Sequence, residues 1–329
     1  MCPLLHRGEV AANTIANRLA LRRMTSRSTV RSRTLSTWQL RTRSLNLGPR
    51  TLVMGVVNIT PDSFSDGGPF LAPDAAIAHA LQLIEEGADL LDLGAESTRP
   101  GSNAGGPSPA VSSGEEQARL LPVLEGILKA RSDAVLSMDT YKAATARAAL
   151  AAGAEIVNDV SGFTWDQELP TVCAQTRCGV ILMHTRGRPE QWRTQSHLDS
   201  DTLLETVRAG LATSLATATQ AGIPPQAIVL DPGYGFGKRL DENFSLLARQ
   251  ADLLSLGRPI LAGLSRKSFL GHALAPLYNG QPAPVTARET ASIAALVAAI
   301  LNGASIVRAH NVRPAVEAAR IADALLNAT

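Results

Sequence analysis

The stretch EEGADLLDLGAES, residues 85 to 97, contains the end of a predicted helix, a glycine, a short apolar strand and a polar exit. Glycine is common where a helix ends in the left-handed conformation. Related transitions recur in AAGAEIVND (151–159), QAGIPPQAIVLD (220–231) and NGASIVRAH (302–310). Repeated helix-to-strand transitions of this kind are typical of parallel α/β folds.

Short apolar runs alternate with Ala/Leu-rich stretches of helical period from Thr51 onward. The expected strands are Leu52–Val57, Asp89–Leu93, Ala134–Met138, Glu155–Val157, Gly179–Met183, Ala227–Leu230, Pro259–Ala262 and Ser305–Val307. The expected helices are Pro73–Glu86, Glu115–Lys129, Lys142–Ala152, Gln167–Thr176, Thr202–Ala221, Asn243–Leu254, Arg288–Asn302 and Val312–Asn327. Eight strand-then-helix units predict a closed, eight-stranded parallel (β/α)8 TIM barrel. An open doubly wound sheet is the alternative, weakened because no dinucleotide fingerprint follows the first strand.

Basic charge is concentrated at the N-terminus. Residues 1 to 50 hold ten Arg and one Glu, a net of +9, whereas the rest holds 21 basic and 28 acidic residues, a net of −7. We expect residues 1–36 to form a disordered basic extension and residues 37–329 to form the catalytic barrel domain. An organelle transit peptide, or a true start nearer Met24, would also explain the extension.

The remaining composition argues for a cytoplasmic enzyme without nucleic-acid or membrane partners. The three cysteines, Cys2, Cys173 and Cys178, lack zinc-site spacing, which suits a reducing compartment. No apolar run reaches the roughly 18 residues of a membrane span.

Polar residues follow every expected strand, and in a barrel these exits converge on one face. They are Asn58; Glu96, Ser97, Thr98 and Arg99; Asp139; Asn158 and Asp159; His184 after Met183; Asp231 and Lys238; Ser265, Arg266, Lys267 and Ser268; Arg308 and His310. We therefore expect one site at the carboxyl ends of the strands.

These side chains divide into two chemistries. The carboxylates, amide and ammonium of one set suit a flat heterocycle with an amide-like edge; they are Asp139, Asn158, Asp231 and Lys267. The other set suits a diphosphate with magnesium bridging its oxygens; it comprises Asn58, Arg99, Arg308 and His310.

Several of these residues have plain structural alternatives. Asp139 and Asp159 could cap the following helices, Arg266 could pair with carboxylates under the barrel mouth, and His184 could be a structural, half-buried histidine. GYGFGK (233–238) lacks the Walker spacing of a phosphate loop. We expect its glycines to let the backbone approach a ring closely, with Phe236 offering an apolar face.

Seven blocks, in this order and spacing, closely resemble the bacterial dihydropteroate synthase family: NITPDSFSDGG, ESTRPG, MDTYK, NDVSG, DPGYGFGK, LSRKS and VRAH. The resemblance extends from about Trp38 to the C-terminus. It implies a folate-synthesis enzyme that joins 4-aminobenzoate to 6-hydroxymethyl-7,8-dihydropterin diphosphate and releases diphosphate. It also implies a homodimer through outer helices, including Ala291–Leu301, and closure of the loops after Asn58 and Ser97 over the substrates.

The resemblance also assigns roles by motif position. The implied pterin-binding residues are Asp139, Asn158, Met183, Asp231, Gly263 and Lys267. The implied diphosphate-binding residues are Asn58, Arg99, Arg308 and His310, with Asn58 also a ligand of Mg2+. The implied aminobenzoate-binding residues are Thr98, Arg99, Phe236 and Ser268. The implied catalytic residues are Asp139, Lys267, Arg308 and His310.

The chain departs from the family pattern in four places. Tyr234 stands where Phe is usual, Asn311 stands where Asp is frequent, HTRGRP (184–189) adds two arginines, and the 101–114 insertion is longer than typical. A second Gly/Pro-rich insertion, 271–286, is expected to be a mobile loop. The functional alternatives are a pterin-binding corrinoid methyltransferase barrel, which does not require the arginine–histidine rim, and a non-catalytic homologue.

Overall fold

The computed structural model describes residues 34–59, 72–98, 102, 104–106 and 111–328 of the chain. Most of the basic extension, most of the opening loop, Arg99 and six of the fourteen residues of the 101–114 insertion therefore lie outside the described residues. The described residues belong to one compact unit, Ser32–Thr329.

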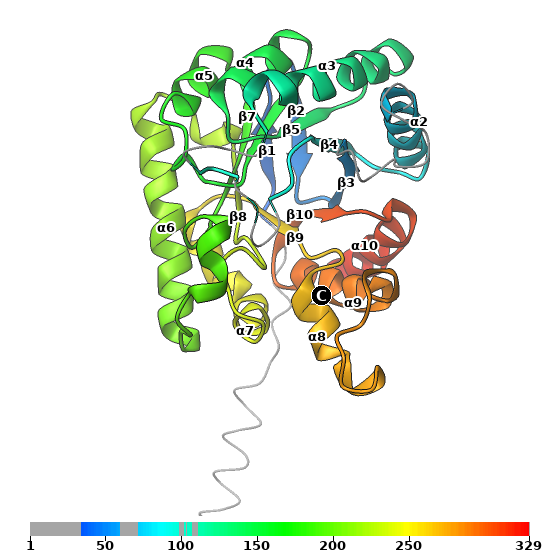
Figure 1. Cartoon of the computed structure of the whole chain (residues 1–329), viewed down its shortest axis with the longest axis vertical. Helices are drawn as coiled ribbons and strands as arrows, with labels where there is room; N and C mark the ends of the chain where they lie inside the picture. The colour runs from blue at the N-terminus through cyan, green and yellow to red at the C-terminus, as the bar shows by residue number, and fades with distance from the viewer. Residues whose placement is uncertain (1–33, 60–71, 99–101, 103, 107–110, 329) are drawn as a thin grey trace, which may run out of the picture. The chain divides into compact units, whose positions relative to one another are not determined.

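A closed barrel of parallel strands forms the centre of this unit, which confirms the predicted fold (Figure 1). Its strands are β3 (Leu52–Asn58), β4 (Leu90–Gly94), β5 (Leu136–Asp139), β6 (Ile156–Asp159), β7 (Gly179–Met183), β8 (Ile228–Asp231), β9 (Ile260–Gly263) and β10 (Ala304–Ala309). The last strand pairs with the first, Arg308 lying opposite Met54. Apolar side chains fill most of these short strands, as expected where both faces of a parallel sheet are covered.

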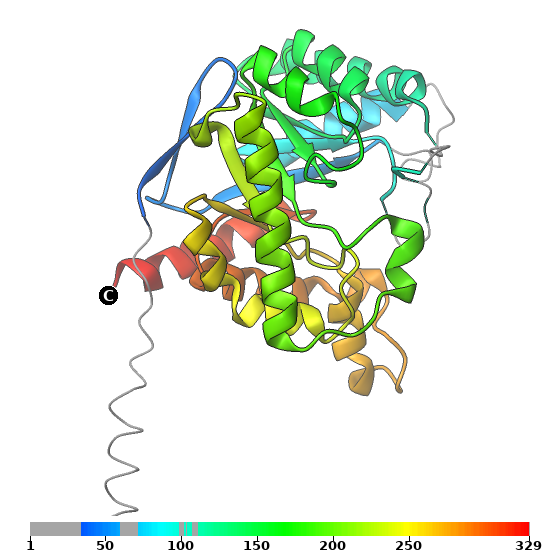
Figure 2. The same cartoon turned by 90° about the vertical axis from the view of Figure 1, so that its left-hand side faces the viewer.

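Helices surround the barrel (Figures 1 and 2). They are α2 (Ala72–Glu85), α3 (Ser113–Ala130), α4 (Ala143–Ala151), α5 (Leu169–Thr176), α6 (Ser200–Gln220), α7 (Glu242–Ala248), α8 (Ser268–Ala273), α9 (Glu289–Leu301) and α10 (Val312–Asn327). Gly87 and Gly303, at the ends of α2 and α9, have φ of +105° and +92°, so the glycine signal at these transitions is a conformational requirement.

Two stretches differ from the expectation. The expected helix Asn243–Leu254 is divided into α7 and a 3-10 helix, η4 (Gln250–Leu256). The 271–286 insertion, expected to be a loop, contains the end of α8 and two 3-10 turns, η5 (Ala275–Leu277) and η6 (Val285–Ala287). Further 3-10 turns are η2 (Pro189–Thr194) and η3 (Pro225–Ala227).

An antiparallel hairpin, β1 (Ser36–Gln39) and β2 (Ser44–Leu47), precedes the barrel and was not predicted. Trp38 is 1% exposed, and its Nε1 donates to the carbonyl of Ala227 at 2.9 Å. Trp38 and Leu40 pack with residues that begin barrel strands, such as Leu90 and Ile156. The hairpin therefore fills the amino end of the barrel, which leaves the carboxyl end for the site.

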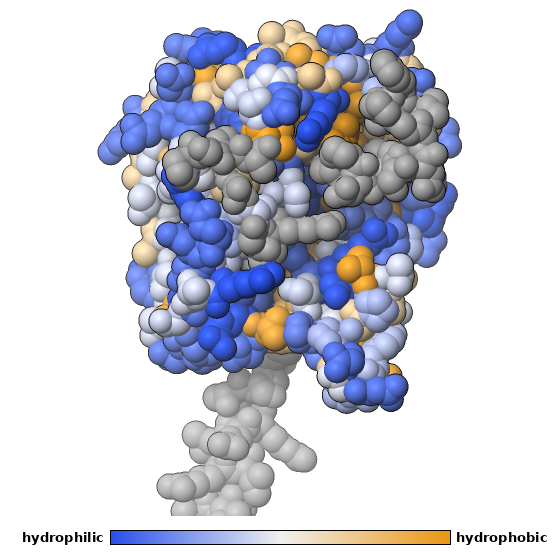
Figure 3. Space-filling model, viewed as in Figure 1, coloured by the Kyte–Doolittle hydropathy of each residue, from blue (hydrophilic) through white to orange (hydrophobic). Residues whose placement is uncertain are grey.

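The face of the molecule drawn in Figure 3 is mainly hydrophilic, with hydrophobic residues in small patches. Among the described residues, every helix is too short or too polar to cross a membrane.

Candidate active site

An ion-pair network at the carboxyl end of the barrel is centred on Arg308. Its Nε lies 2.6 Å from Asp92 Oδ2, and its Nη2 lies 2.9 Å from Asp139 Oδ2. Asp92, on β4, is fully buried and also accepts from Asn158 Nδ2 at 2.9 Å and from Ser137 Oγ at 2.7 Å. Two predicted site residues, Arg308 and Asn158, thus meet on a carboxylate that the sequence analysis did not select.

The surroundings of Asp139 change its titration. Burial, followed by the negative charge of Asp92, raises the pKa of Asp139 to about 7, although Arg308 opposes the shift. Asp139 is not a helix cap, because Asp166 Oδ2 accepts the first backbone N–H of α4, from Ala143, at 2.8 Å. Asp139 can therefore exchange a proton near neutral pH at the centre of the site.

Asp159, by contrast, has a structural role, although it binds a turn and does not cap the following helix, as its alternative proposed. Its two carboxylate oxygens accept from the backbone N–H groups of Ser161 and Phe163, at 2.8 and 2.6 Å. It therefore fixes the turn after β6 and is not directed at a ligand.

A second acidic group lies across the barrel. Asp231 is 7% exposed, accepts from Gly233 N at 2.7 Å, and has its pKa raised by burial. A Cβ on Gly263 would lie 3.9 Å from Asp231 Oδ2 and 4.0 Å from Arg308 Cβ. Gly263 therefore lies between Asp231 and Arg308, and a Cβ there would make ordinary van der Waals contact with both.

Lys267 lies at the N-cap of α8, with its Nζ 4.1 Å from the centroid of the Phe236 ring. Burial lowers the pKa of Lys267 to about 8, against the opposing charges of Asp231 and Asp139. The ammonium group is still mostly charged at neutral pH, so it can donate to an acceptor on a bound ring.

An apolar cluster borders these polar groups. Met183, which pairs in register with Asp231, is 4% exposed. Its cluster contains Ala104, Tyr141, Val160, Trp165 and Phe236. Polar groups on one side and a thioether with aromatic rings on the other are the usual surroundings of a planar heterocycle.

The side chains that follow β9 and β10 are held by hydrogen bonds to one another. His310 Nδ1 lies 2.9 Å from Ser265 Oγ, which orients the imidazole. Arg266 has a left-handed φ of +60°, and its Nη2 donates to Asn311 Oδ1 at 2.8 Å. Arg266 is structural, as its alternative proposed, but its partner is the amide that replaces the family's frequent Asp.

The glycine-rich loop after β8 is held by Lys238. Its Nζ donates to the carbonyls of His184, Gly233 and Phe236 at 3.2, 2.8 and 3.3 Å, and burial lowers its pKa to about 7. A Cβ on Gly233 would lie 1.9 Å from the His184 carbonyl oxygen. The glycine thus admits the neighbouring backbone of β7, and Lys238 joins the two loops.

His184 itself is buried beside these cations. Burial, Lys238 and Arg186 hold the pKa of His184 well below its usual range. The imidazole is therefore neutral. It is buried, and its Nδ1 has no hydrogen-bond partner among the described residues, so it differs from the half-buried structural histidine that was expected.

A buried charge cluster supports the loop after β4. Lys142 Nζ lies 2.6 Å from Glu96 Oε2 and 3.1 Å from Glu116 Oε2, and Thr145 Oγ1 donates to Glu116 at 2.7 Å. The cluster ties Glu96, two residues before Thr98, to α3 and α4. Lys142 belongs to the MDTYK block, but its position in the sequence alone predicts no role for it.

Three further predicted residues are exposed or partly buried. Asn58 ends β3 with an exposed side chain, Thr98 is partly buried, and Ser268 is the exposed first residue of α8. Within the described ranges, no three His, Cys, Asp or Glu side chains are grouped as a metal site. A metal here would need oxygen ligands from elsewhere, such as an amide and a bound diphosphate.

Comparisons with known proteins agree with this geometry. A family model described as "Pterin binding enzyme" matches residues 54–310. A dihydropteroate synthase of Synechocystis is 41% identical over 278 residues, which cover 84% of this chain and 91% of that protein.

Solved structures are similar as well. Xanthomonas albilineans dihydropteroate synthase with 4-aminobenzoic acid has a TM-score of 0.77 and 39% identity, covering 89% of this chain and 98% of that one. The same enzyme in complex with 7,8-dihydropteroate has a TM-score of 0.75 and 37% identity, with 88% and 98% coverage.

Proposed function

We propose a site with a pterin end and a diphosphate end, on the premise that this chain belongs to the dihydropteroate synthase family of pterin-binding enzymes. The enzyme is a transferase of folate biosynthesis. It condenses 6-hydroxymethyl-7,8-dihydropterin diphosphate with 4-aminobenzoate to give 7,8-dihydropteroate and diphosphate. The division of labour within the site is the proposal.

The Arg308 network carries the proposal. Its guanidinium is held by two carboxylates from β4 and β5, so its orientation is fixed before a substrate binds. On this account Arg308 and His310 hold the diphosphate. Asp139, Asn158, Asp231 and Lys267 bind the polar edge of the pterin, with Gly263 and Met183 against the ring.

The reaction needs no activated side-chain nucleophile. The arylamine nitrogen forms a bond to the pterin methylene carbon as the carbon–oxygen bond to diphosphate breaks, and the amine loses a proton. Arg308 stabilises the charge that develops on the leaving oxygen. The neighbouring carboxylate of Asp139 stabilises positive charge on the pterin, and its pKa of about 7 lets it take up or release a proton at this end.

Mg2+ fits the oxygen chemistry of this end. The amide oxygen of Asn58 lies at the carboxyl end of β3, next to β10, and magnesium is commonly held by few protein ligands together with substrate phosphates. Asn58 would hold the ion, which when bound would neutralise charge on the diphosphate.

The aminobenzoate is proposed to lie against Phe236, bordered by Thr98, Arg99 and Ser268. The ring of Phe236 has an apolar face beside the Lys267 ammonium, which suits an aromatic acid. Arg99 lies outside the described residues, and its role rests on the family resemblance.

The activity is tested by incubating purified protein with both substrates and Mg2+ while measuring 7,8-dihydropteroate and diphosphate. Equimolar formation of the two products is expected. Absence of diphosphate release would reject the condensation, and methyl transfer from a methyl-pterin would support the corrinoid methyltransferase alternative. That alternative does not require the arginine and histidine of β10.

We also propose a cytoplasmic homodimer in which residues 37–329 are sufficient for activity. Cys173 and Cys178 are free and buried, which suits a reducing compartment, and α10 exposes Ile321 and Leu325. A variant lacking residues 1–36 keeps Trp38 and all of the hairpin except Ser36. Full activity and a dimeric mass in sedimentation would support these points, and a monomer or a loss of activity would contradict them.

A further inference from the structure

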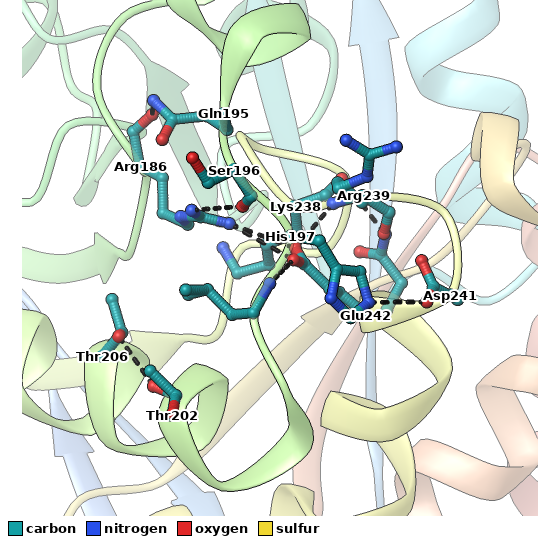
Figure 4. Close-up of polar contacts among 12 residues, drawn as sticks. Arg186, Gln195, Ser196, His197, Thr202, Thr206, Lys238, Arg239, Asp241 and Glu242 are labelled. Atoms are coloured by element: carbon teal, nitrogen blue, oxygen red, sulfur yellow. Dashed lines mark hydrogen bonds and ion pairs between the residues drawn. The ribbon is translucent and has the colours of Figure 1, made fainter.

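A buried ion pair lies beside the site, between the loops that follow β7 and β8. Arg186 Nη1 is 3.2 Å from Glu242 Oε2, and the two side chains are 10% and 1% exposed (Figure 4). Desolvating two charges costs several kcal/mol each, which the attraction offsets only when the remaining polar atoms also find partners. The surroundings of this pair meet that condition.

Glu242, the first residue of α7, binds two separate segments of the chain. Its Oε1 accepts from Leu198 N and its Oε2 from Arg239 N, both at 2.7 Å. One carboxylate therefore joins the segment before α6 to the end of the glycine-rich loop. Figure 4 shows these contacts converging on Glu242.

Arg186 binds the opposite side of the same junction. Its Nη2 donates to the Ser196 carbonyl at 2.9 Å, and its own carbonyl accepts from Gln195 Nε2 at 2.9 Å. Its backbone N–H donates to the Phe236 carbonyl at 3.4 Å. The pair is thus connected by backbone hydrogen bonds to the loop that carries Phe236.

The ring of Phe236 is held by the same segment. Trp192 packs edge-on against it with centroids 5.1 Å apart, and Trp192 Nε1 donates to the Gly187 carbonyl at 3.1 Å. A Cβ on Gly237 would lie 2.7 Å from Arg186 Cβ and 3.0 Å from Trp192 Cδ1. Only glycine fits here, so the loop, Arg186 and Trp192 form one packed unit.

We propose that Arg186 and Glu242 are a positioning pair that fixes the ring of Phe236, and thereby sets the affinity of the site for the arylamine substrate. The inference rests on the proposed function, in which Phe236 borders the aminobenzoate. The pair acts through Trp192 and the backbone of the glycine-rich loop rather than on the reacting atoms. Of the proposed pterin contacts, Asp139 is held by Arg308 and Asn158 by Asp92. These two lie on other elements and stay in place without the pair.

The test is steady-state kinetics of Glu242→Gln with each substrate varied in turn. We expect the KM for 4-aminobenzoate to rise about tenfold, while kcat and the KM for the pterin diphosphate stay within about twofold. Glu205→Gln is the matched control, because Glu205 pairs with Arg208 at 2.6 Å on exposed α6 and should leave both KM values unchanged.

Arg186→Lys keeps the charge, but it replaces the guanidinium, which contacts Glu242 and the Ser196 carbonyl through two different nitrogens, with one ammonium. It should reproduce the selective rise in KM, and it serves as the test if Glu242→Gln does not fold. Equal changes in the two KM values, or lost stability with both KM values unchanged, would overturn the proposal by making the pair merely structural.

Phe236→Ala separates this inference from the proposed site. If Phe236→Ala raises the KM for 4-aminobenzoate and the pair variants do not, the positioning role is wrong and the site stands. If Phe236→Ala itself leaves that KM unchanged, the assignment of Phe236 is wrong and the positioning role falls with it.

Discussion

Asp92→Asn tests the network that orients Arg308. The carboxylate accepts from Arg308, Asn158 and Ser137, all donors, at 2.6, 2.9 and 2.7 Å. The amide that replaces the carboxylate keeps one acceptor oxygen. Its NH2 group, however, faces one of the groups that donated to the carboxylate. Removing one partner of a buried ion pair costs about 3–5 kcal/mol. Arg308 retains Asp139 at 2.9 Å, so we expect a loss near the lower value, about 3 kcal/mol in the free energy of unfolding.

The functional effect follows from the same contacts. Without Asp92 the guanidinium loses its Nε contact, worth about 2 kcal/mol as a charge-assisted hydrogen bond. If half to all of that loss is felt by bound diphosphate, its affinity falls about five- to thirtyfold, since 1.4 kcal/mol is tenfold. The assay is urea denaturation followed by calorimetric titration of diphosphate with Mg2+.

Glu155→Gln is the control for this variant. It removes a buried carboxylate at the amino end of the barrel, where Glu155 accepts from Thr42 N at 2.9 Å, so it should lower stability while leaving diphosphate affinity unchanged. Folded Asp92→Asn protein with wild-type diphosphate affinity would refute the claim that Asp92 orients Arg308.

Two further predictions concern titration and packing. The folded-state pKa of Asp139, about 7, lies above its ordinary 3.8, so its contribution to stability is fully present below pH 3.8 and is lost as pH rises through about 7. Asp139→Asn should therefore flatten the decline in unfolding free energy between pH 4 and 7, and an unchanged pH profile would contradict this. Gly233→Ala should destabilise the protein by at least about 2 kcal/mol, because its Cβ would meet the His184 carbonyl at 1.9 Å with φ at +70°. A melting temperature within a degree of wild type would refute that packing argument.

The sequence predicts the barrel because its signals are local and repeated. Each glycine that ends a helix, such as Gly87 or Gly303, fixes a transition without help from distant residues. The hairpin around Trp38 is not predicted because its strands have only four residues each. Their burial depends on contact with distant residues, such as Ala227 just before the amino end of β8. The break after α7 likewise has no strong local signal.

The sequence likewise predicts some residues of the site but not others. Polar residues at strand ends, such as Asp139 and Arg308, are visible because a barrel brings those ends together. Asp92 lies within the apolar strand LLDLG, and a buried Asp in such a strand is itself a signal, but its partners come from three other strands. The role of Glu242 depends on contacts between loops that sequence spacing does not encode.

The division of the site into two ends is tested most directly by calorimetry with pterin and with diphosphate separately, the latter in the presence of Mg2+. Lys267→Met should weaken pterin binding at least tenfold and leave diphosphate binding within about twofold, and Arg308→Lys should do the reverse. Equal losses of both ligands in either variant would contradict the division.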